Sequence, residues 1–219
     1  MELKQAIEKR QSIRKFKGSE IPEHHLREII EAAGKAPSGE NLQNWHFVVI
    51  QNKETKAQVR EIIREKNEEI ALLVEQVNIE RAQRFRKVCK NFTLFAMDAP
   101  VLILVFSGTY TPSGYIEYQL IHRPTQDLDE LFYRRNPGMQ SLGAALQTLA
   151  LKAVELGYGT CWLTSGNYAG DEIQKWAKEQ NIFYKEGYFM ASMMALGIPE
   201  DGAKSPGRKP LEEIYTYIV

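Results

Sequence analysis

The sequence has 219 residues, 43% of them hydrophobic, and its 28 Lys and Arg residues balance 28 Asp and Glu residues. A chain of this length can bury one sizeable core, so we expect a single domain over residues 1–219. The zero net charge argues against a nucleic-acid or anionic-membrane partner, because both attract strongly basic surfaces. No apolar run approaches the roughly 20 residues of a membrane-spanning helix, so no membrane partner is expected.

Cysteine and histidine usage argues against two kinds of site. Cys89 and Cys161 lie far apart and form no CxxC pair, so neither a disulfide framework nor a zinc site is expected. The four histidines lack HExxH or similar spacing, and we expect no metal. The charged start MELKQAIEKRQS differs from a signal peptide or an anchor. We therefore expect the protein in the reducing cytoplasm.

Hydrophobic periodicity predicts the elements of the first half of the chain. Residues 2–10 and the segment IPEHHLREIIEAAGKAP are expected to be helical, and HFVVIQ is expected to be the first strand. Residues 53–97 form a long, charge-rich helical region that we expect to be broken at least once. The continuous apolar run APVLILVFSG predicts a strand that is buried on both faces.

The second half alternates irregular, helical and strand-like segments. Residues 108–135 are rich in Tyr, Pro and Gly, which is typical of a lid or binding loop. The segment NPGMQSLGAALQTLALKAVELGYG predicts a helix that is apolar on nearly every side, and such helices lie centrally or in subunit interfaces. TCWLTS and YFMASMMALGI are expected to be strands with a helix near 170–180 between them, and the tail PLEEIYTYIV is β-prone. This order predicts an α/β or α+β sandwich around a four- or five-stranded sheet.

Two basic motifs suit a phosphate group. In RQSIRKF, Arg10, Ser12 and Arg14 alternate, so in an extended segment their side chains would share one face. Two guanidinium groups beside a hydroxyl suit phosphate, because arginine pairs with phosphate oxygens in bidentate geometry. In SPGRKPLEE, Arg208 offers a third basic partner. The plainer interpretation of both motifs is a solvated basic surface.

Two further motifs suit a planar ligand. In APSGENLQNWHF, Ser38, Asn41 and Gln43 could hydrogen-bond a heterocycle while the backbone of residues 37–39 lies against it. The plainer interpretation is a turn beside a buried Trp45. GYGTCWLTSG is glycine-rich, but no GxGxxG followed by a helix is present, so a dinucleotide fold is not indicated. Its plainer interpretation is a helix C-cap that runs into a strand.

Taken together, the four motifs resemble those of the FMN-dependent nitroreductase superfamily, which includes an iodotyrosine deiodinase-like branch. The family's Arg-Arg-Ser-x-Arg-x-Phe stands here as RQSIRKF, with Gln11 in place of the second arginine. Its Ala-Pro-Ser-Gly/Ala-x-Asn-x-Gln-Pro-Trp-x-Phe stands as APSGENLQNWHF, with Asn44 in place of the proline. LGYGTCW, GIP and GRKPLEE match later elements, so the matches run in order from residue 10 to residue 213.

The resemblance implies an FMN site built from these motifs. Arg10, Ser12 and Arg208 would hold the phosphate, with the main-chain amide of Gln11 contributing. Arg14 would lie near the N1–C2 carbonyl edge of the flavin. The remaining ring contacts would come from the first loop and, from the other subunit's side, from the third motif: Pro37, Ser38, Gly39, Asn41, Trp162, Leu163 and Thr164.

The resemblance also implies the fold and the assembly. The expected fold is an α+β nitroreductase-like sandwich, in which helices flank a central four- to five-stranded mixed sheet. FMN would lie at the interface of an obligate homodimer that is built partly from residues 137–156. The C-terminal segment would be exchanged, crossing to the sheet of the partner.

The implied activity is that of an FMN-dependent oxidoreductase. NADH or NADPH would reduce the flavin at N5, and a small electron-poor acceptor such as a nitroaromatic or a quinone would then take its place. No catalytic acid or base from the protein is implied. We expect substrate contacts in residues 108–135 and near Phe85, Phe92 and Phe95, with core packing as the alternative. Two other functions stay open: reductive dehalogenation of a halotyrosine-like substrate, and a flavin-binding module without turnover.

Overall fold

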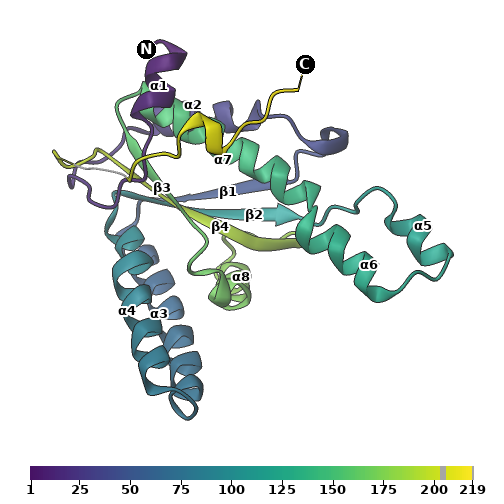
Figure 1. Cartoon of the computed structure of the whole chain (residues 1–219). Coiled ribbons are helices and arrows are strands. Elements are labelled where there is room, and N and C mark those ends of the chain that lie inside the picture. The colour runs from purple at the N-terminus through teal and green to yellow at the C-terminus, as the bar shows by residue number, and fades with distance from the viewer. Residues whose placement is uncertain (203–205, 219) are drawn as a thin grey trace.

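A four-stranded sheet forms the centre of the computed structural model, which describes residues 1–202 and 206–218 (Figure 1). The strand order is β1-β2-β4-β3. The central strands β2 and β4 are buried along most of their length, as their continuous apolar sequences predict. The strands are β1 (Trp45–Ile50), β2 (Val101–Gly108), β3 (Gly159–Leu163) and β4 (Tyr188–Gly197).

The pairings among these four strands are antiparallel, which corrects the expected mixed sheet. The chain leaves β1 along α3 (Lys53–Glu75) and returns along α4 (Ile79–Phe92). Because the two helices form a hairpin, the chain re-enters the sheet at the end where it left, and Ile50 pairs with Leu102. A single crossover helix would have delivered a parallel strand. Among the described residues, an isolated bridge between Ser12 and Thr160 is parallel.

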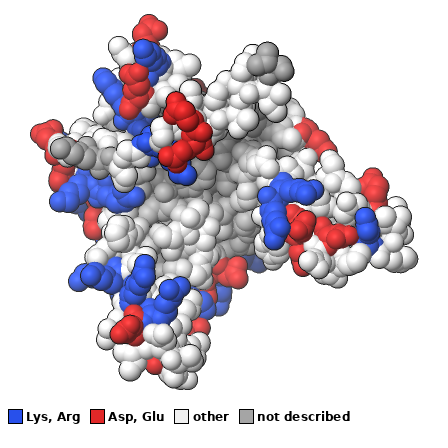
Figure 2. Space-filling model, viewed as in Figure 1, with Lys and Arg blue, Asp and Glu red and all other residues white. Residues whose placement is uncertain are grey.

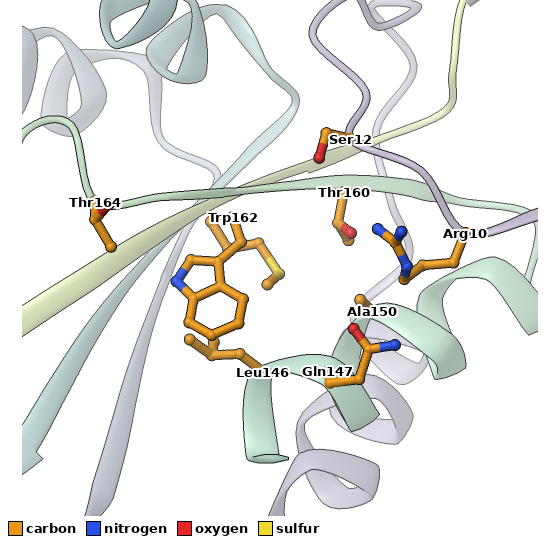
Figure 3. A pocket seen from close by; sticks show the side chains of 9 residues that line it. Arg10, Ser12, Leu146, Gln147, Ala150, Thr160, Trp162 and Thr164 are labelled. Carbon is orange, nitrogen blue, oxygen red and sulfur yellow. The ribbon is translucent and has the colours of Figure 1, made fainter. Parts of the chain in front are cut away.

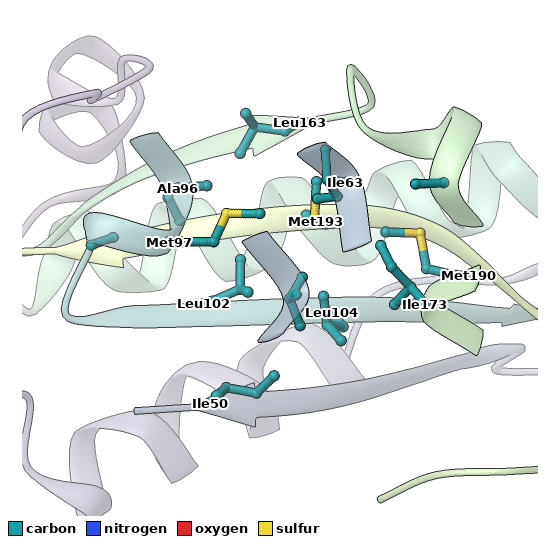
Figure 4. Packing of buried hydrophobic residues seen from close by; sticks show 14 of the residues in the cluster. Ile50, Ile63, Ala96, Met97, Leu102, Leu104, Leu163, Ile173, Met190 and Met193 are labelled. Atoms are coloured by element: carbon teal, nitrogen blue, oxygen red, sulfur yellow. The ribbon is translucent and has the colours of Figure 1, made fainter. Parts of the chain in front are cut away.

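Helices cover both faces of the sheet. On one face lie α1 (Leu3–Lys9), α2 (Glu23–Gly34) and α7 (Pro137–Glu155). On the other lie α3, α4 and α8 (Gly170–Glu179), where Ile63 lies beside Met193 and Ile173 beside Met190 of β4 (Figure 4). Two short helices, α5 (Tyr115–Leu120) and α6 (Thr125–Asp129), form a lobe beside the sheet (Figure 1). The lobe falls within the irregular segment expected at residues 108–135.

The expected break in the long charged region lies between α3 and α4. Asn78 caps α4 by accepting a hydrogen bond from Arg81 N at 2.9 Å, as Asn52 caps α3. Arg86 of α4 bonds Glu68 at 2.9 Å and Glu75 at 2.8 Å, both on α3. These charged bonds hold the two helices together where they project from the sheet (Figure 1).

Helix α7 is the most buried helix on its face. Asn136 caps it by accepting from Met139 N at 3.0 Å, and Pro137 occupies the first turn, where its missing N–H is not needed. Leu142, Leu146 and Leu149 lie in the core between the sheet and α2. The apolar sequence on its other sides is half-buried in the single chain.

The C-terminal tail forms no strand within the described residues. A 3-10 turn spans Leu211–Glu213. The apolar residues after it are exposed in the single chain: Ile214, Tyr215, Tyr217 and Ile218. The exchange of this tail with a partner therefore stays a prediction. Among the described residues, no helix has the length and hydrophobicity needed to cross a membrane.

Replacing Leu149 with alanine should destabilise the protein strongly, because its side chain is fully buried between α7 and the sheet. A cavity of this kind typically costs roughly 2–5 kcal/mol. Chemical denaturation at one fixed protein concentration measures the loss. Leu72→Ala is the matched control, since Leu72 is 54% exposed and its loss should cost less than about 0.5 kcal/mol. Equal losses for the two variants would contradict the described core.

Candidate functional site

A pocket of about 300 Å³ lies between β3, the N-terminal segment and α7 (Figure 3). Arg10 lies towards one end and Trp162 towards the other, with Thr160 between them (Figure 3). Its volume is at the lower end of the usual range for ligand pockets. The lining consists of Arg10, Ser12, Leu146, Gln147, Ala150, Thr160, Trp162, Thr164 and Met194.

Strand alternation decides which residues of the third motif face the pocket. Thr160 and Trp162 point towards α7, whereas Cys161 and Leu163 point into the core on the opposite face. The side chain of Leu163 is only 4% exposed, so it packs away from the pocket. Trp162 and Thr164 thus share the pocket with Arg10 within one chain, although the resemblance implied that they come from the other subunit's side.

The N-terminal segment reaches the pocket because it runs directly along β3. Ile13 N donates to Thr160 O at 2.8 Å, next to the parallel bridge of Ser12. A Cβ atom on Gly159 would lie 2.5 Å from Cγ1 of Ile13, so only glycine permits this approach. The close contact brings this segment to the pocket. The side chains do not share one face as alternation predicts, because the Ser12 hydroxyl bonds Cys161 on the opposite face of the sheet, where the charge of Arg14 also acts.

Three other predicted residues lie outside the lining of this pocket. Arg14 is exposed, and its charge acts on Cys161 on the opposite face of the sheet. Gln11 lines a neighbouring pocket together with Tyr158. Arg208 is exposed in the segment that follows the undescribed residues 203–205.

The first loop lies at the N-terminal end of α7 rather than in the pocket. Gly39 N donates to Ser141 Oγ at 3.1 Å, and Gln43 N donates to Ser38 Oγ at 3.0 Å. Pro37 and Asn41 are exposed. Ser141 precedes Gln147 of the pocket by six residues, about 9 Å along a helix. One helix therefore carries both the loop and the pocket.

The backbone of this loop is strained. Glu40, Asn41 and Gln43 have φ angles of 53°, 55° and 46°, in the left-handed region that non-glycine residues rarely adopt. Each such residue costs on the order of 1–3 kcal/mol, and strain of this kind clusters at ligand sites. Three strained residues in one exposed loop point to a functional segment.

Asn44 anchors the end of the loop. Its Nδ2 donates to Ser107 Oγ at 2.9 Å, and its main-chain oxygen accepts from Gly108 N at 2.7 Å. Its buried Oδ1 has no hydrogen-bond partner among the described atoms. Asn44 therefore ties the loop to β2 at the position where the family pattern has proline. Trp45 is half-buried against the core of the α7 face, in line with its plainer interpretation.

Sequence reasoning missed Thr160 and Gln147 as lining residues. Thr160 could have been found by alternation, because it lies two residues before Trp162 on the same strand. Gln147 is an exposed polar residue that follows the apolar run Leu142–Leu146 of α7, and this interruption was the available signal. Among the described lining residues, Arg10 is the one charged side chain, and the hydroxyls of Thr160 and Thr164 line the same pocket, whereas the Ser12 hydroxyl bonds Cys161 on the opposite face of the sheet. This donor set suits an anion.

Comparison with known proteins identifies the family. The family model described as the nitroreductase family matches residues 7–198. The chain belongs to the nitroreductase family. Among the described residues of this nitroreductase-family chain, no group of three His, Cys, Asp or Glu side chains could hold a metal ion.

Three relatives place the chain within the nitroreductase family. A BluB-like flavoprotein from Clostridium difficile 630 is 52% identical, with 100% of both chains covered and a TM-score of 0.95. Iodotyrosine deiodinase from Hydra vulgaris is 30% identical over 94% of this chain and 68% of its own length. A nitroreductase with bound FMN from Bacteroides fragilis NCTC 9343 is 20% identical, with 100% of both chains covered and a TM-score of 0.67, which shows a shared fold. The chain spans 64% of the Danio rerio deiodinase, so these curated relatives are longer.

Both thiols of this family member should resist modification in the folded state. Burial raises the pKa of Cys89 and of Cys161, and the thiolate is the reactive form. Dithiobisnitrobenzoate at pH 8 should label neither thiol quickly, and both after unfolding. The charge of Arg14 opposes the effect of burial at Cys161, so Arg14→Gln should slow its labelling further, whereas the distant Arg27→Gln should not. Rapid labelling of either thiol in the folded protein would contradict this.

Proposed function

We propose that the chain binds FMN in the pocket beside β3 and reduces small electron-poor acceptors with NADH or NADPH. The observation that carries the proposal is a pocket with Arg10 towards one end and Trp162 towards the other (Figure 3), in a chain of the nitroreductase family. When bound, FMN would supply the hydride chemistry, through N5 of its ring. The protein would bind and orient the reacting molecules.

The pocket residues fit a flavin monophosphate. Arg10 is half-buried, and Thr160 lies beside it in the lining, so a phosphate there would meet a positive charge and a hydroxyl donor. At the other end, Trp162 offers a planar apolar face for a ring system. Arg208 and Arg14 are exposed and outside the lining. Their proposed contacts with FMN would require the tail or their side chains to move towards the pocket.

The strained loop supports a homodimeric site. In one chain, residues 37–41 do not line the pocket, yet Glu40 and Asn41 adopt strained φ angles of the kind that cluster at ligand sites. We infer that the loop of a second copy supplies Pro37, Ser38, Gly39 and Asn41 to complete the site. In this arrangement Trp162 and Thr164 come from the same chain as Arg10, whereas the resemblance implied that they come from the other subunit's side.

Surfaces that stay uncovered in one chain also favour a second copy. Figure 2 shows a hollow between the α3–α4 hairpin and the α5–α6 lobe that is largely free of Lys, Arg, Asp and Glu. Ala144 of α7 is only half-buried, and a small residue permits close approach of another helix. The exposed apolar tail could extend the sheet of the partner at β1, whose outer edge is unpaired within the described residues.

The lining leaves little acid–base chemistry to the protein. Among its described members there is no carboxylate, histidine or lysine that could move a proton. Leu146, Trp162 and Met194 form an apolar wall that would exclude water from the ring end. The chain's contribution would therefore be binding, orientation and solvent exclusion.

Reductive dehalogenation of a halotyrosine-like substrate is the second candidate function. The observation that favours it is the 30% identity to an iodotyrosine deiodinase over 94% of this chain. A deiodinase would use the same FMN site with a different acceptor. The two functions therefore differ in the substrate and not in the cofactor.

Arg10→Ala should weaken FMN binding about ten- to a hundredfold, because a lost charge-assisted hydrogen bond typically costs roughly 1.5–3 kcal/mol. Fluorescence titration of the flavin-free protein with FMN measures the change. Arg27→Ala is the control, since Arg27 pairs with Glu23 on the exposed face of α2. If Arg10→Ala binds FMN as tightly as the wild type, Arg10 does not hold the phosphate.

An acceptor screen tests the activity. We expect steady-state oxidation of NADH or NADPH that depends on an added nitroaromatic or quinone. Release of iodide from iodotyrosine by dithionite-reduced protein, without acceptor-dependent NAD(P)H oxidation, would favour the dehalogenase instead. A flavin-loaded protein that turns over neither class of substrate would contradict both enzymatic functions and favour a flavin-binding module without turnover.

A further inference from the structure

Trp162 combines an exposed ring with a satisfied nitrogen. The residue is 44% exposed, yet its Nε1 donates a hydrogen bond to Ser192 Oγ at 2.6 Å. Figure 3 shows the indole between β3 and Leu146 of α7, at the edge of the pocket. An indole nitrogen can only donate, so this single bond satisfies it and fixes which way that edge of the ring points.

Ser192 links this ring to the backbone of β3. It is 1% exposed on β4, and its hydroxyl donates to Leu163 O at 2.8 Å. A carbonyl oxygen can only accept and an indole nitrogen can only donate, so the roles of the hydroxyl are unambiguous. Its single proton goes to Leu163, and its lone pair is directed at Trp162.

The position of Ser192 is itself fixed by the strand. Val105 pairs with Ser192 but Phe106 pairs with Met190, so Ala191 is the extra residue of a β-bulge. The side-chain amide of Asn167 donates to Ala191 O at 2.7 Å and so satisfies the carbonyl at the bulge. Bulges next to sites commonly aim a side chain. Here the bulge immediately precedes Ser192.

The far end of the indole meets helix α7. A Cβ atom on Gly143 would lie 3.4 Å from Cη2 of Trp162, so the ring reaches close to the helix backbone at this glycine. The indole therefore spans the gap between β4 and α7. It is bonded at one end to Ser192 and stopped at the other by Gly143.

We propose that Ser192 is a positioning residue that holds Trp162 as a fixed wall of the flavin pocket. The inference rests on the proposed FMN function. Because the ring is already immobilised, binding a ligand does not have to order it. The entropy cost of ordering this side chain is therefore not subtracted from the binding free energy. The sequence gives no motif for Ser192, which follows Trp162 by thirty residues and meets it only across the sheet.

A double-mutant cycle on FMN affinity tests the proposal. Ser192→Ala should weaken FMN binding roughly two- to tenfold, the usual worth of one hydrogen bond. In a Trp162→Phe background, where no N–H exists to hold, the same change should have no further effect. Tyr168→Phe is the matched control, since it removes the hydroxyl of a half-buried residue that bonds Cys89 on the opposite face of the sheet. It should leave FMN affinity unchanged.

The indole signal of Trp162 gives a second readout that needs no flavin. The chain has three tryptophans, and the ¹⁵N–¹H indole peak that disappears in Trp162→Phe identifies Trp162. In Ser192→Ala this peak should shift and its proton should exchange faster with water. An unchanged peak and exchange rate would overturn the positioning role.

The outcomes separate the two proposals. A wild-type protein that binds no FMN overturns the proposed function, and with it the flavin part of this inference. A wild-type protein that binds FMN, with a Ser192→Ala variant that binds it equally well, overturns the inference alone. Equal losses from Ser192→Ala in the wild-type and Trp162→Phe backgrounds would also overturn it, because Ser192 would then act without Trp162.

Discussion

The packing of α7 between the sheet and α2 is the constraint on which the candidate site depends. Leu146 and Leu149 are fully buried there, which fixes the helix against β2 and β4. The same helix holds the strained loop through Ser141 and forms one wall of the pocket through Leu146 and Gln147. A shift of α7 would therefore displace both halves of the site together. Because the loop contacts α7 at Ser141 and the pocket contacts it at Gln147, the two parts of the site lie apart within a single chain.

Much of the fold could be predicted from the sequence because its strongest signals are local. Pro137 and the apolar run after it predict α7, and the charge-rich region breaks at residues 76–78, as expected from its length. The direction of the strands could not be predicted in this way. A continuous apolar run fits any strand covered on both faces, and only the α3–α4 hairpin makes β2 antiparallel to β1.

The candidate site could likewise be predicted only in part from the sequence. Arg10 reaches the pocket because its segment runs along β3. The prediction that Ser12 and Arg14 share its face is wrong, because both act on Cys161 on the opposite face of the sheet. Strand alternation does hold within β3. Leu163 lies between Trp162 and Thr164 in the sequence, so alternation predicts that its side chain points into the core, as observed. The distance between the loop and the pocket, and the bond between Ser192 and Trp162, depend on the tertiary fold. Motif spacing carries no information about either.

The central claim is that each flavin site takes Arg10 from one copy and the strained loop from the other. It can be tested with heterodimers that combine an Arg10→Ala chain and a Pro37→Glu chain, purified through two different tags. Pro37 is exposed, so the substitution should leave the fold intact while it blocks the ring. Each variant homodimer should bind FMN poorly, whereas the heterodimer should bind about one FMN, because one of its sites would contain both wild-type parts. A heterodimer that binds no more FMN than the two homodimers would contradict the account, since both parts would then belong to the same chain.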